Sequence, residues 1–177
     1  MRVLVDMDDT STSWRGGIHR RLTTDGHGID WLDWSRWEGV PLGASDEQAA
    51  AFAAAMASPG FYVDLEPIDG AAEALNAMID AGHVVFLCST PDSTNATCPS
   101  DKRDWAEKHL GRGWGRRLIL SHDKTLIRGD YLIDDKPVIT GELVPEWEHV
   151  LFDQPYNRHI TDRRRITDWS QWAEVLG

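Results

Sequence analysis

The sequence predicts an α/β fold with a central parallel five-stranded sheet flanked by helices, and a small, mainly helical cap inserted after the first strand. After residue 68, short apolar runs alternate with helical patterns, which is typical of parallel strands joined by right-handed crossovers. The runs are continuously apolar, as strands buried on both faces are. A long polar, tryptophan-rich stretch separates the first run from the others, and this stretch predicts the insertion.

The first strand is the run RVLV at residues 2–5, which ends in Asp6. Its β-branched and apolar residues favour a short buried strand. Four later runs have the same character and complete the predicted sheet: residues 84–88, 118–120, 131–133 and 149–152.

Four segments carry helical signals. Ser45 or Asp46 caps the first, an alanine-rich segment that a Pro-Gly pair ends. The second has apolar residues at helical spacing and stops at a glycine. In chain order, the four predicted helices are residues 45–58, 70–81, 101–110 and 168–176.

The chain therefore divides into a core, residues 1–13 and 67–177, and an inserted cap, residues 14–66. Within the cap, three tryptophans are spaced three residues apart: Trp31, Trp34 and Trp37. Such a stripe lies on one side of a helix or of tight turns. It is typical of packing, because aromatic side chains bury large areas. The alternative is an aromatic wall that stacks on a planar ligand such as a base.

The composition excludes several classes of partner. Eighteen Lys and Arg against 29 Asp and Glu give a net charge of −11, which argues against a nucleic acid polymer. No apolar run approaches the roughly 20 residues that span a bilayer, and no leader is expected, so no membrane partner is predicted. Two cysteines, Cys88 and Cys98, are too few for a disulfide framework. Reduced thiols in a cytoplasmic protein are the simplest interpretation.

Polar side chains follow three of the predicted strands at the point where each ends. Asp6 and Asp8 follow the first strand and Ser89 and Thr90 the second, and an Asp-Asp pair at 134–135 follows the fourth. The carboxyl ends of parallel strands lie at one edge of the sheet, where open α/β folds bind ligands. We therefore expect these groups to converge on one crevice.

The chemistry of these groups suggests a metal and a phosphate. Clustered carboxylates without a counterion would repel one another, and oxygen-only ligands favour a hard cation, Mg²⁺ before Ca²⁺ or Zn²⁺. Lys102 and Lys124 lie beside neighbouring elements and can neutralise a phosphoryl group, to which hydroxyls donate hydrogen bonds. One aspartate can then act as nucleophile and another as proton donor. Each feature alone is typical of a solvated turn or helix surface. Their occurrence together, in this order along the chain and at the predicted strand ends, indicates a site.

The blocks "DMDDT", "FLCSTP" and "DKT…GDYLIDDKP" resemble the haloacid dehalogenase (HAD) superfamily of phosphohydrolases. The longer blocks "LEPIDGAAEALNAMIDAGHVVFLCSTP", "KRDWAEKHLG" and "WEHVLFDQPYN" resemble the 5′(3′)-deoxyribonucleotidase family. The resemblance covers residues 1–10 and roughly 59–157, and it implies a Rossmann-like HAD core. In function it implies a Mg²⁺-dependent phosphomonoesterase that dephosphorylates (deoxy)ribonucleoside monophosphates.

The resemblance also implies roles for the first aspartates. Asp6 would attack phosphorus and form an aspartyl-phosphate, and Asp8 would protonate the leaving oxygen and later deprotonate the hydrolytic water. Mg²⁺ would be held by Asp6, the backbone carbonyl of Asp8, and Asp135, with Asp134 supporting.

Further positions would bind the substrate. Ser89 and Thr90 would bind phosphate oxygens, and Lys124 would be the phosphate lysine, with Lys102 as the competing choice. Trp14 stands where the family tends to place a Phe near the base. Lys136 stands where the family commonly has an Arg, so a fork-like contact to substrate would be lost. The candidate residues for binding substrate and phosphate are therefore Ser89, Thr90, Lys124, Lys102, Trp14 and Lys136.

Two alternatives stay open at the level of sequence. The same chemistry on another small phosphorylated metabolite, such as a sugar phosphate, is the first, although an aromatic cap disfavours it. The second is a signalling receiver domain, but such domains place the acid pair after the first strand, whereas here the Asp-Asp pair follows the fourth. The assembly state is also open, with a homodimer as one alternative.

Overall fold

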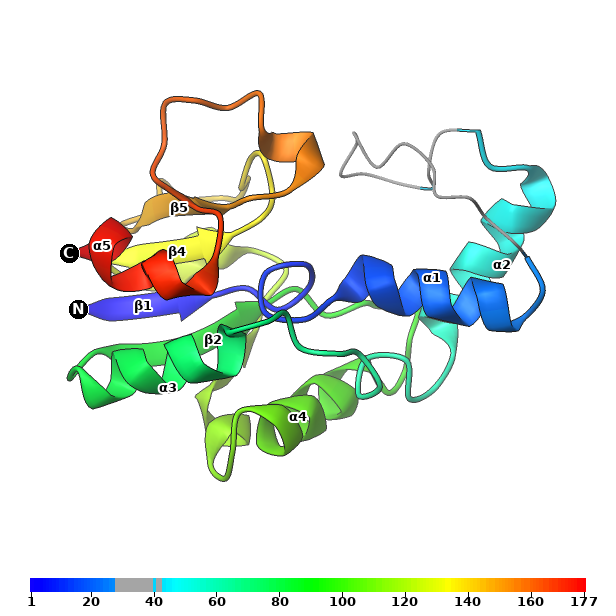
Figure 1. Ribbon diagram of the computed structural model, residues 1–177, viewed down its shortest axis with the longest axis horizontal. Helices are drawn as coiled ribbons and strands as arrows, with labels where there is room; N and C mark the ends of the chain where they lie inside the picture. The colour runs from blue at the N-terminus through cyan, green and yellow to red at the C-terminus, as the bar shows by residue number, and fades with distance from the viewer. Residues whose placement is uncertain (28–39, 41–42) are drawn as a thin grey trace.

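The computed structural model describes residues 1–27, 40 and 43–177. The predicted stripe of Trp31, Trp34 and Trp37 lies outside the described residues. Within them the chain forms a central sheet with helices α3, α4 and α5 beside it, and helices α1 and α2 lie beyond the end of β1 (Figure 1).

The sheet is parallel throughout and has the strand order β3-β2-β1-β4-β5-β6. The five predicted strands are confirmed. A sixth strand of two residues, next to β5, was not predicted because so short a segment carries no apolar run. The strands are β1 Arg2–Val5, β2 Val84–Ser89, β3 Leu118–Leu120, β4 Tyr131–Asp134, β5 Glu148–Phe152 and β6 Arg165–Ile166.

Four of the five described helices agree with the predictions except at their ends, and the first, α1, was not predicted. The described α-helices are α1 Trp14–Thr24, α2 Asp46–Ala57, α3 Ala71–Asp80, α4 Cys98–His109 and α5 Trp172–Leu176. Ser45 caps α2 through a capping box with Gln48. Helix α4 begins three residues before the predicted Asp101, with Pro99 in its first turn, where proline is tolerated. The predicted terminal helix is shorter, because residues Trp169–Gln171 form a 3₁₀ turn.

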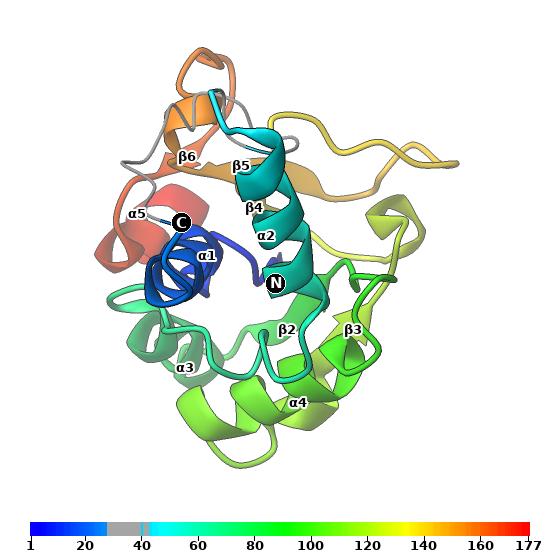
Figure 2. The same cartoon turned by 90° about the vertical axis from the view of Figure 1, so that its right-hand side faces the viewer.

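Side chains of β1 alternate between two cores. Val3 and Val5 belong to the larger core, which buries the apolar faces of α3, α4 and α5. Leu4 points to the opposite face and packs with Leu132 and Trp147 in a smaller core. Among the described residues, that second face is covered by connecting segments rather than by α-helices, and Figure 2 shows α3 and α4 together below the sheet.

The polar positions at the strand ends meet because of the register. Val5 of β1 lies opposite Leu87 of β2 and opposite Ile133 of β4. Asp6 therefore follows Val5 at the same level at which Asp134 follows Ile133, and Ser89 ends β2 nearby. The carboxyl edge of the sheet thus collects these polar side chains, as the sequence predicts.

Helices α1 and α2 connect β1 to the rest of the core and lie beyond this carboxyl edge (Figure 1). They pack against each other, and the rings of Trp14 and Phe52 meet edge to face with their centroids 5.8 Å apart. The boundaries of the predicted cap, residues 14–66, stay a prediction. Across the described part of the chain, every helix is too short or too polar to cross a bilayer.

Candidate active site

The loop after β1 is a tight turn built on one carbonyl. The backbone N–H groups of Thr10, Ser11 and Thr12 all donate to the Met7 carbonyl, at 3.2, 2.9 and 2.7 Å. Asp9 adopts a left-handed backbone (φ 53°), which Asp tolerates better than most side chains. Its carboxylate accepts a hydrogen bond from the backbone N–H of Arg15 at 3.0 Å. Asp9 thus shapes the turn and joins it to α1.

Asp6 is paired with a buried lysine. Lys124 Nζ lies 2.7 Å from Asp6 Oδ1 and 2.5 Å from Asp134 Oδ2, and all three side chains are at most 4% exposed. Burial disfavours the charged ammonium, but the two acids outweigh it and raise the pKa of Lys124. The residue is therefore a fixed positive charge between two carboxylates.

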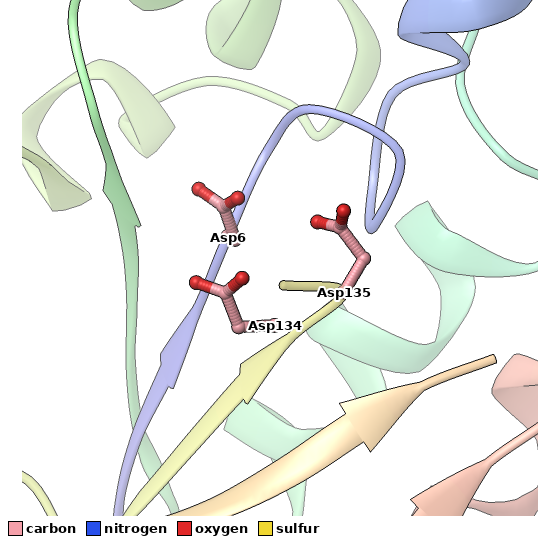
Figure 3. A group of neighbouring side chains, drawn as sticks. All are labelled: Asp6, Asp134 and Asp135. Carbon is pink, nitrogen blue, oxygen red and sulfur yellow. The ribbon is translucent and has the colours of Figure 1, made fainter. Parts of the chain in front are cut away.

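Asp135 is held by hydrogen bonds on both carboxylate oxygens. Thr10 Oγ1 donates to Oδ1 at 2.9 Å, and the Tyr156 hydroxyl donates to Oδ2. The Asn157 side chain donates to the Asp135 backbone carbonyl at 2.7 Å. These donors fix the direction in which the Asp135 carboxylate points, toward Asp6 and Asp134 (Figure 3).

Asp6, Asp134 and Asp135 together fit a divalent cation. Each offers one carboxylate oxygen, and the three atoms lie within 4.8 Å of one another. Burial, followed by repulsion from Asp134 and Asp6, raises the pKa of Asp135 well above its ordinary value. Lys124 bonds directly to two of the three acids, Asp6 and Asp134. A donor set of oxygens alone suits Mg²⁺ or another hard cation.

Asp8 lies outside this cluster and has its own lysine. Lys102 Nζ donates to Asp8 Oδ2 at 2.6 Å, to Ser89 Oγ at 2.8 Å and to the Thr90 carbonyl at 3.0 Å. Lys102 comes from α4 and is 1% exposed, whereas the Asp8 side chain is 30% exposed. The other Asp8 oxygen, Oδ1, is buried without a hydrogen-bond partner in the described chain.

The two carboxylates therefore differ in their electrostatics. Burial opposes ionisation of Asp6, but the ammonium groups of Lys124, Lys136 and Lys102 outweigh it and hold the pKa of Asp6 below its ordinary value. Burial raises the pKa of Asp8, and Lys102 only partly opposes this. A pair of acids with pKa values pushed apart is suited to one charged and one protonated role.

A cavity of about 390 Å³ opens above these groups. Six of the predicted site residues line it: Asp6, Asp8, Trp14, Thr90, Asp135 and Lys136. The other four are buried beneath it and reach it through their partners: Ser89, Lys102, Lys124 and Asp134. The Lys136 ammonium lies 3.5 Å from Thr90 Oγ1. All ten predicted residues therefore gather in one region.

Several residues around the cavity escaped the sequence analysis. Arg15 stacks its guanidinium 3.9 Å from the centroid of the Tyr156 ring, and Tyr62 and Asp92 form a hydrogen-bonded pair on the wall. These residues come from loops and from the first turn of α1, where no apolar periodicity marks them. For Asp92, its place just after the Ser-Thr-Pro strand end was the available signal.

Solved structures with the same fold include a HAD family hydrolase from Deinococcus radiodurans, with bound phosphate and sodium. It is 18% identical, has a TM-score of 0.60, and matches over 99% of this chain and 94% of that chain. A hydrolase from Pseudomonas syringae is 14% identical with a TM-score of 0.55, over 99% and 97% of the two chains. At these identities the likeness shows the fold alone.

Sequence relatives are much closer. The human cytosolic-type 5′(3′)-deoxyribonucleotidase is 37% identical over 191 residues, which is 99% of this chain and 93% of that protein. The mouse mitochondrial 5′(3′)-deoxyribonucleotidase is 34% identical over 193 residues, 99% of this chain and 85% of that protein. A relative from Bordetella pertussis is 50% identical over 119 residues, a match that spans 67% of this chain and 63% of the relative's length.

The family described as 5′ nucleotidase, deoxy (pyrimidine), cytosolic type C matches residues 1–176. The match includes both aspartates of the first loop, the Ser-Thr pair, both lysines and the Asp-Asp pair described above. The resemblance inferred from the sequence blocks is thereby confirmed, and the chain belongs to the cytosolic type C 5′-nucleotidase family.

Proposed function

We propose that the protein is a phosphomonoesterase that hydrolyses (deoxy)ribonucleoside monophosphates through an aspartyl-phosphate, with Mg²⁺ as cofactor. One observation carries the proposal. Asp6 and Asp8 stand two residues apart at the floor of the cavity, and each is paired with a different buried lysine. Lys124 holds the buried Asp6 charged, whereas burial raises the pKa of Asp8 against the effect of Lys102, so Asp8 can hold the proton that ester hydrolysis requires.

In the first step, an Asp6 oxygen attacks phosphorus and the bond from phosphorus to the ester oxygen breaks. Asp8 gives its proton to that leaving oxygen, so the product leaves as a neutral alcohol. Lys102 bonds to Asp8, Ser89 and the Thr90 carbonyl, and so fixes the proton donor beside the phosphate-binding hydroxyls.

In the second step, water attacks the phosphorus of the aspartyl-phosphate and Asp8 takes the water's proton. The bond from phosphorus to the Asp6 oxygen breaks, inorganic phosphate forms and the Asp6 carboxylate is restored. Lys124 stays charged beside Asp6 and balances the negative charge that gathers there.

Asp6, Asp135 and the Asp8 backbone carbonyl would hold Mg²⁺, and Asp134 would support the site from its place between Lys124 Nζ and the Lys136 backbone N–H. Bound there, the cation would neutralise phosphate oxygens and orient the phosphoryl group for in-line attack. The oxygen-only ligand set supports this assignment.

A nucleotide as substrate is supported by the family and by the wall of the cavity. The human and mouse relatives are named as 5′(3′)-deoxyribonucleotidases. Trp14 lines the cavity and packs on Phe52 of α2, so an aromatic surface is available to a base. We assign residues 14–66 as the cap that shields the intermediate and selects the substrate. A cytoplasmic location and a homodimer remain predictions.

The test is phosphate release from a panel of 5′ and 3′ (deoxy)nucleotides and sugar phosphates, with Mg²⁺ and with EDTA. We expect nucleotides to be preferred and activity to be lost in EDTA. Preference for sugar phosphates over every nucleotide would replace the proposed substrate class and leave the chemistry in place. Full activity in EDTA would contradict the role of the metal.

A further inference from the structure

Tyr62 and Asp92 form a polar pair on the wall of the cavity that the proposed mechanism does not use. The Tyr62 hydroxyl donates to Asp92 Oδ2 at 2.9 Å, and both side chains line the cavity. Tyr62 follows α2 and Asp92 follows β2, so the pair joins the segment after the cap helices to the end of a core strand.

Both members are held in place. Asp92 Oδ1 accepts hydrogen bonds from the backbone N–H and the hydroxyl of Thr94, at 2.8 and 2.6 Å, and the Asp92 backbone N–H donates to Cys98 Sγ at 3.2 Å. The Tyr62 residue is 2% exposed, and its ring packs edge-on against Phe61 at 5.0 Å. A wall this constrained can present polar atoms in a fixed direction.

The pair offers the cavity acceptors only. Tyr62 has one hydroxyl proton and has committed it to Asp92, which leaves the phenolic oxygen as an acceptor. Burial, with Asp8 and Asp92 nearby, raises the pKa of Tyr62, so the hydroxyl keeps that proton. An ionised carboxylate has about four acceptor sites, and the hydrogen bonds from Tyr62 and Thr94 use three of those of Asp92. A partner in the cavity must therefore be a hydrogen-bond donor.

The position of the pair identifies which part of a substrate it meets. Lys102 Nζ lies 5.0 Å from the centroid of the Tyr62 ring and 2.6 Å from Asp8. Asp8 is the proposed proton donor to the leaving oxygen, so Tyr62 stands beside the alcohol that leaves. In a nucleotide that alcohol is the sugar, and the donors that a sugar carries are hydroxyl groups.

We propose that Tyr62 and Asp92 accept a hydrogen bond from a sugar hydroxyl of the nucleotide and so determine which sugars are hydrolysed efficiently. This inference rests on the proposed nucleotidase function. It assigns the pair a part in specificity, separate from the acid, base and metal-binding residues.

The competing explanation is structural. A buried tyrosine hydroxyl usually finds a hydrogen-bond partner, and Asp92 could serve only that purpose. A purely structural pair would affect all nucleotides alike when broken. A pair that binds a hydroxyl affects only substrates that carry the hydroxyl.

The experiment compares three nucleotides that share one base: UMP, dUMP and 2′,3′-dideoxyuridine 5′-monophosphate, which carry two, one and no sugar hydroxyls at these positions. Values of kcat/KM are measured with Mg²⁺ for the wild type and for Asp92→Ala and Tyr62→Phe. Asp80→Asn removes an exposed carboxylate at the end of α3 and is the matched control.

The deciding quantity is the ratio of kcat/KM for the nucleotide that carries the recognised hydroxyl to kcat/KM for the nucleotide that lacks it. For the wild type we expect this ratio to be about 10 to 100, the range of a hydrogen bond to a charged group. In Asp92→Ala that ratio should shrink below about threefold, because the acceptor is gone and the Tyr62 proton is released. Tyr62→Phe keeps the ring and should also shrink the ratio, and it decides the question if Asp92→Ala does not fold. Asp80→Asn should keep the wild-type ratio.

A wild type that hydrolyses all three nucleotides equally well would overturn the inference and leave the nucleotidase function standing. Unchanged ratios in the folded variants, with all rates lowered together, would establish the structural explanation instead. If the wild type hydrolyses a sugar phosphate but none of the three nucleotides, the proposed nucleotidase function fails, and the inference fails with it.

Discussion

Lys102 Nζ lies 2.6 Å from the Asp8 carboxylate, and the lysine is almost completely buried. Its counterpart, Lys124, lies 2.7 Å from Asp6. From the sequence, the two lysines compete for one role as the phosphate lysine. In the structure the two lysines have different partners, because Lys102 binds Asp8 and Lys124 binds Asp6. Each pair can therefore be tested separately.

Asp6→Asn should lower kcat by more than about 10⁴-fold, because an amide cannot replace the attacking carboxylate. The side chain is of nearly the same size, so the fold should be kept. Phosphate release with a preferred nucleotide measures the loss, and circular dichroism with thermal unfolding checks the fold. Turnover at a wild-type rate would contradict the aspartyl-phosphate mechanism.

Lys102→Met should change the pH dependence as well as the rate. Lys102 lowers the pKa of Asp8 against the effect of burial, so its removal should raise that pKa further. Since Asp8 must be protonated to act as the acid, the alkaline limb of the kcat/KM profile should move to higher pH. We also expect a fall of about 100-fold in kcat, within the range for misplacing a general acid.

The control for this variant is Lys108→Met, which removes an exposed lysine from the same helix. It should leave both the rate and the pH profile unchanged. Lys102→Arg keeps the positive charge and should retain the wild-type position of the alkaline limb. An unshifted limb in Lys102→Met would show that Lys102 does not set the protonation of Asp8.

Tyr156→Phe should weaken Mg²⁺ binding about 10- to 100-fold, because the hydroxyl that orients the Asp135 carboxylate is lost. Bound Mg²⁺ stabilises the folded state by mass action, so the midpoint of thermal unfolding should rise with Mg²⁺ in the wild type. The stabilisation grows as RT ln(1 + c/Kd), where c is the Mg²⁺ concentration, so the concentration at which the midpoint begins to rise measures the affinity without any assay of activity.

Tyr131→Phe provides the matched control for this measurement. Tyr131 is at the start of β4, and its hydroxyl accepts a hydrogen bond from Arg164 at 3.3 Å. It should show the wild-type dependence on Mg²⁺. An onset of the rise at the same Mg²⁺ concentration in Tyr156→Phe and the wild type would mean that Asp135 needs no support from Tyr156.

His149 should make the protein less stable in mild acid. Burial and the neighbouring Arg163 lower the pKa of His149 to about 4, whereas the unfolded chain has an ordinary value near 6.5. Below pH 6.5 the unfolded state therefore binds more protons than the folded state, so stability falls from pH 6.5 down to about 4 and levels off below. The contribution lost by pH 4.5 is at most about 2 to 3 kcal/mol.

Urea unfolding at pH 7.5 and 4.5 measures this contribution. His149→Gln should show a smaller loss than the wild type, since Gln does not titrate and can still accept the hydrogen bond from Arg163, whose Nη1 lies 2.9 Å from His149 Nδ1. His159→Gln changes an exposed histidine and should behave as the wild type. Equal losses in all three proteins would assign the acid sensitivity to other groups.

The strands and the groups that end them could be predicted because their signals are local. Continuous apolar runs marked all five longer strands, and the polar residues at the carboxyl ends of β1, β2 and β4 met at one edge because parallel strands align these ends. The two-residue strand β6 lacked such a run. Helix α1 contains two glycines and has only a weak apolar face, so its sequence did not predict a helix.

Pairings between distant residues could not be predicted. Asp8 and Lys102 are 94 positions apart, and Thr10 and Asp135 are 125 positions apart. No pattern in the sequence says that Lys102 reaches Asp8 while Lys124 reaches Asp6, because both contacts depend on how α4 and the segment after β3 pack on the sheet. The same is true of Tyr62 and Asp92, which meet only where two loops adjoin.

The sequence by itself determined the α/β class, the longer strands, the family and the candidate residues at the strand ends, because hydrophobic patterning and short motifs are properties of neighbouring positions. The tertiary structure alone decided which lysine neutralises which aspartate, which donors orient Asp135 and which side chains form the wall of the cavity. These depend on burial and on distances of a few ångströms between remote segments, and only the packed chain fixes both.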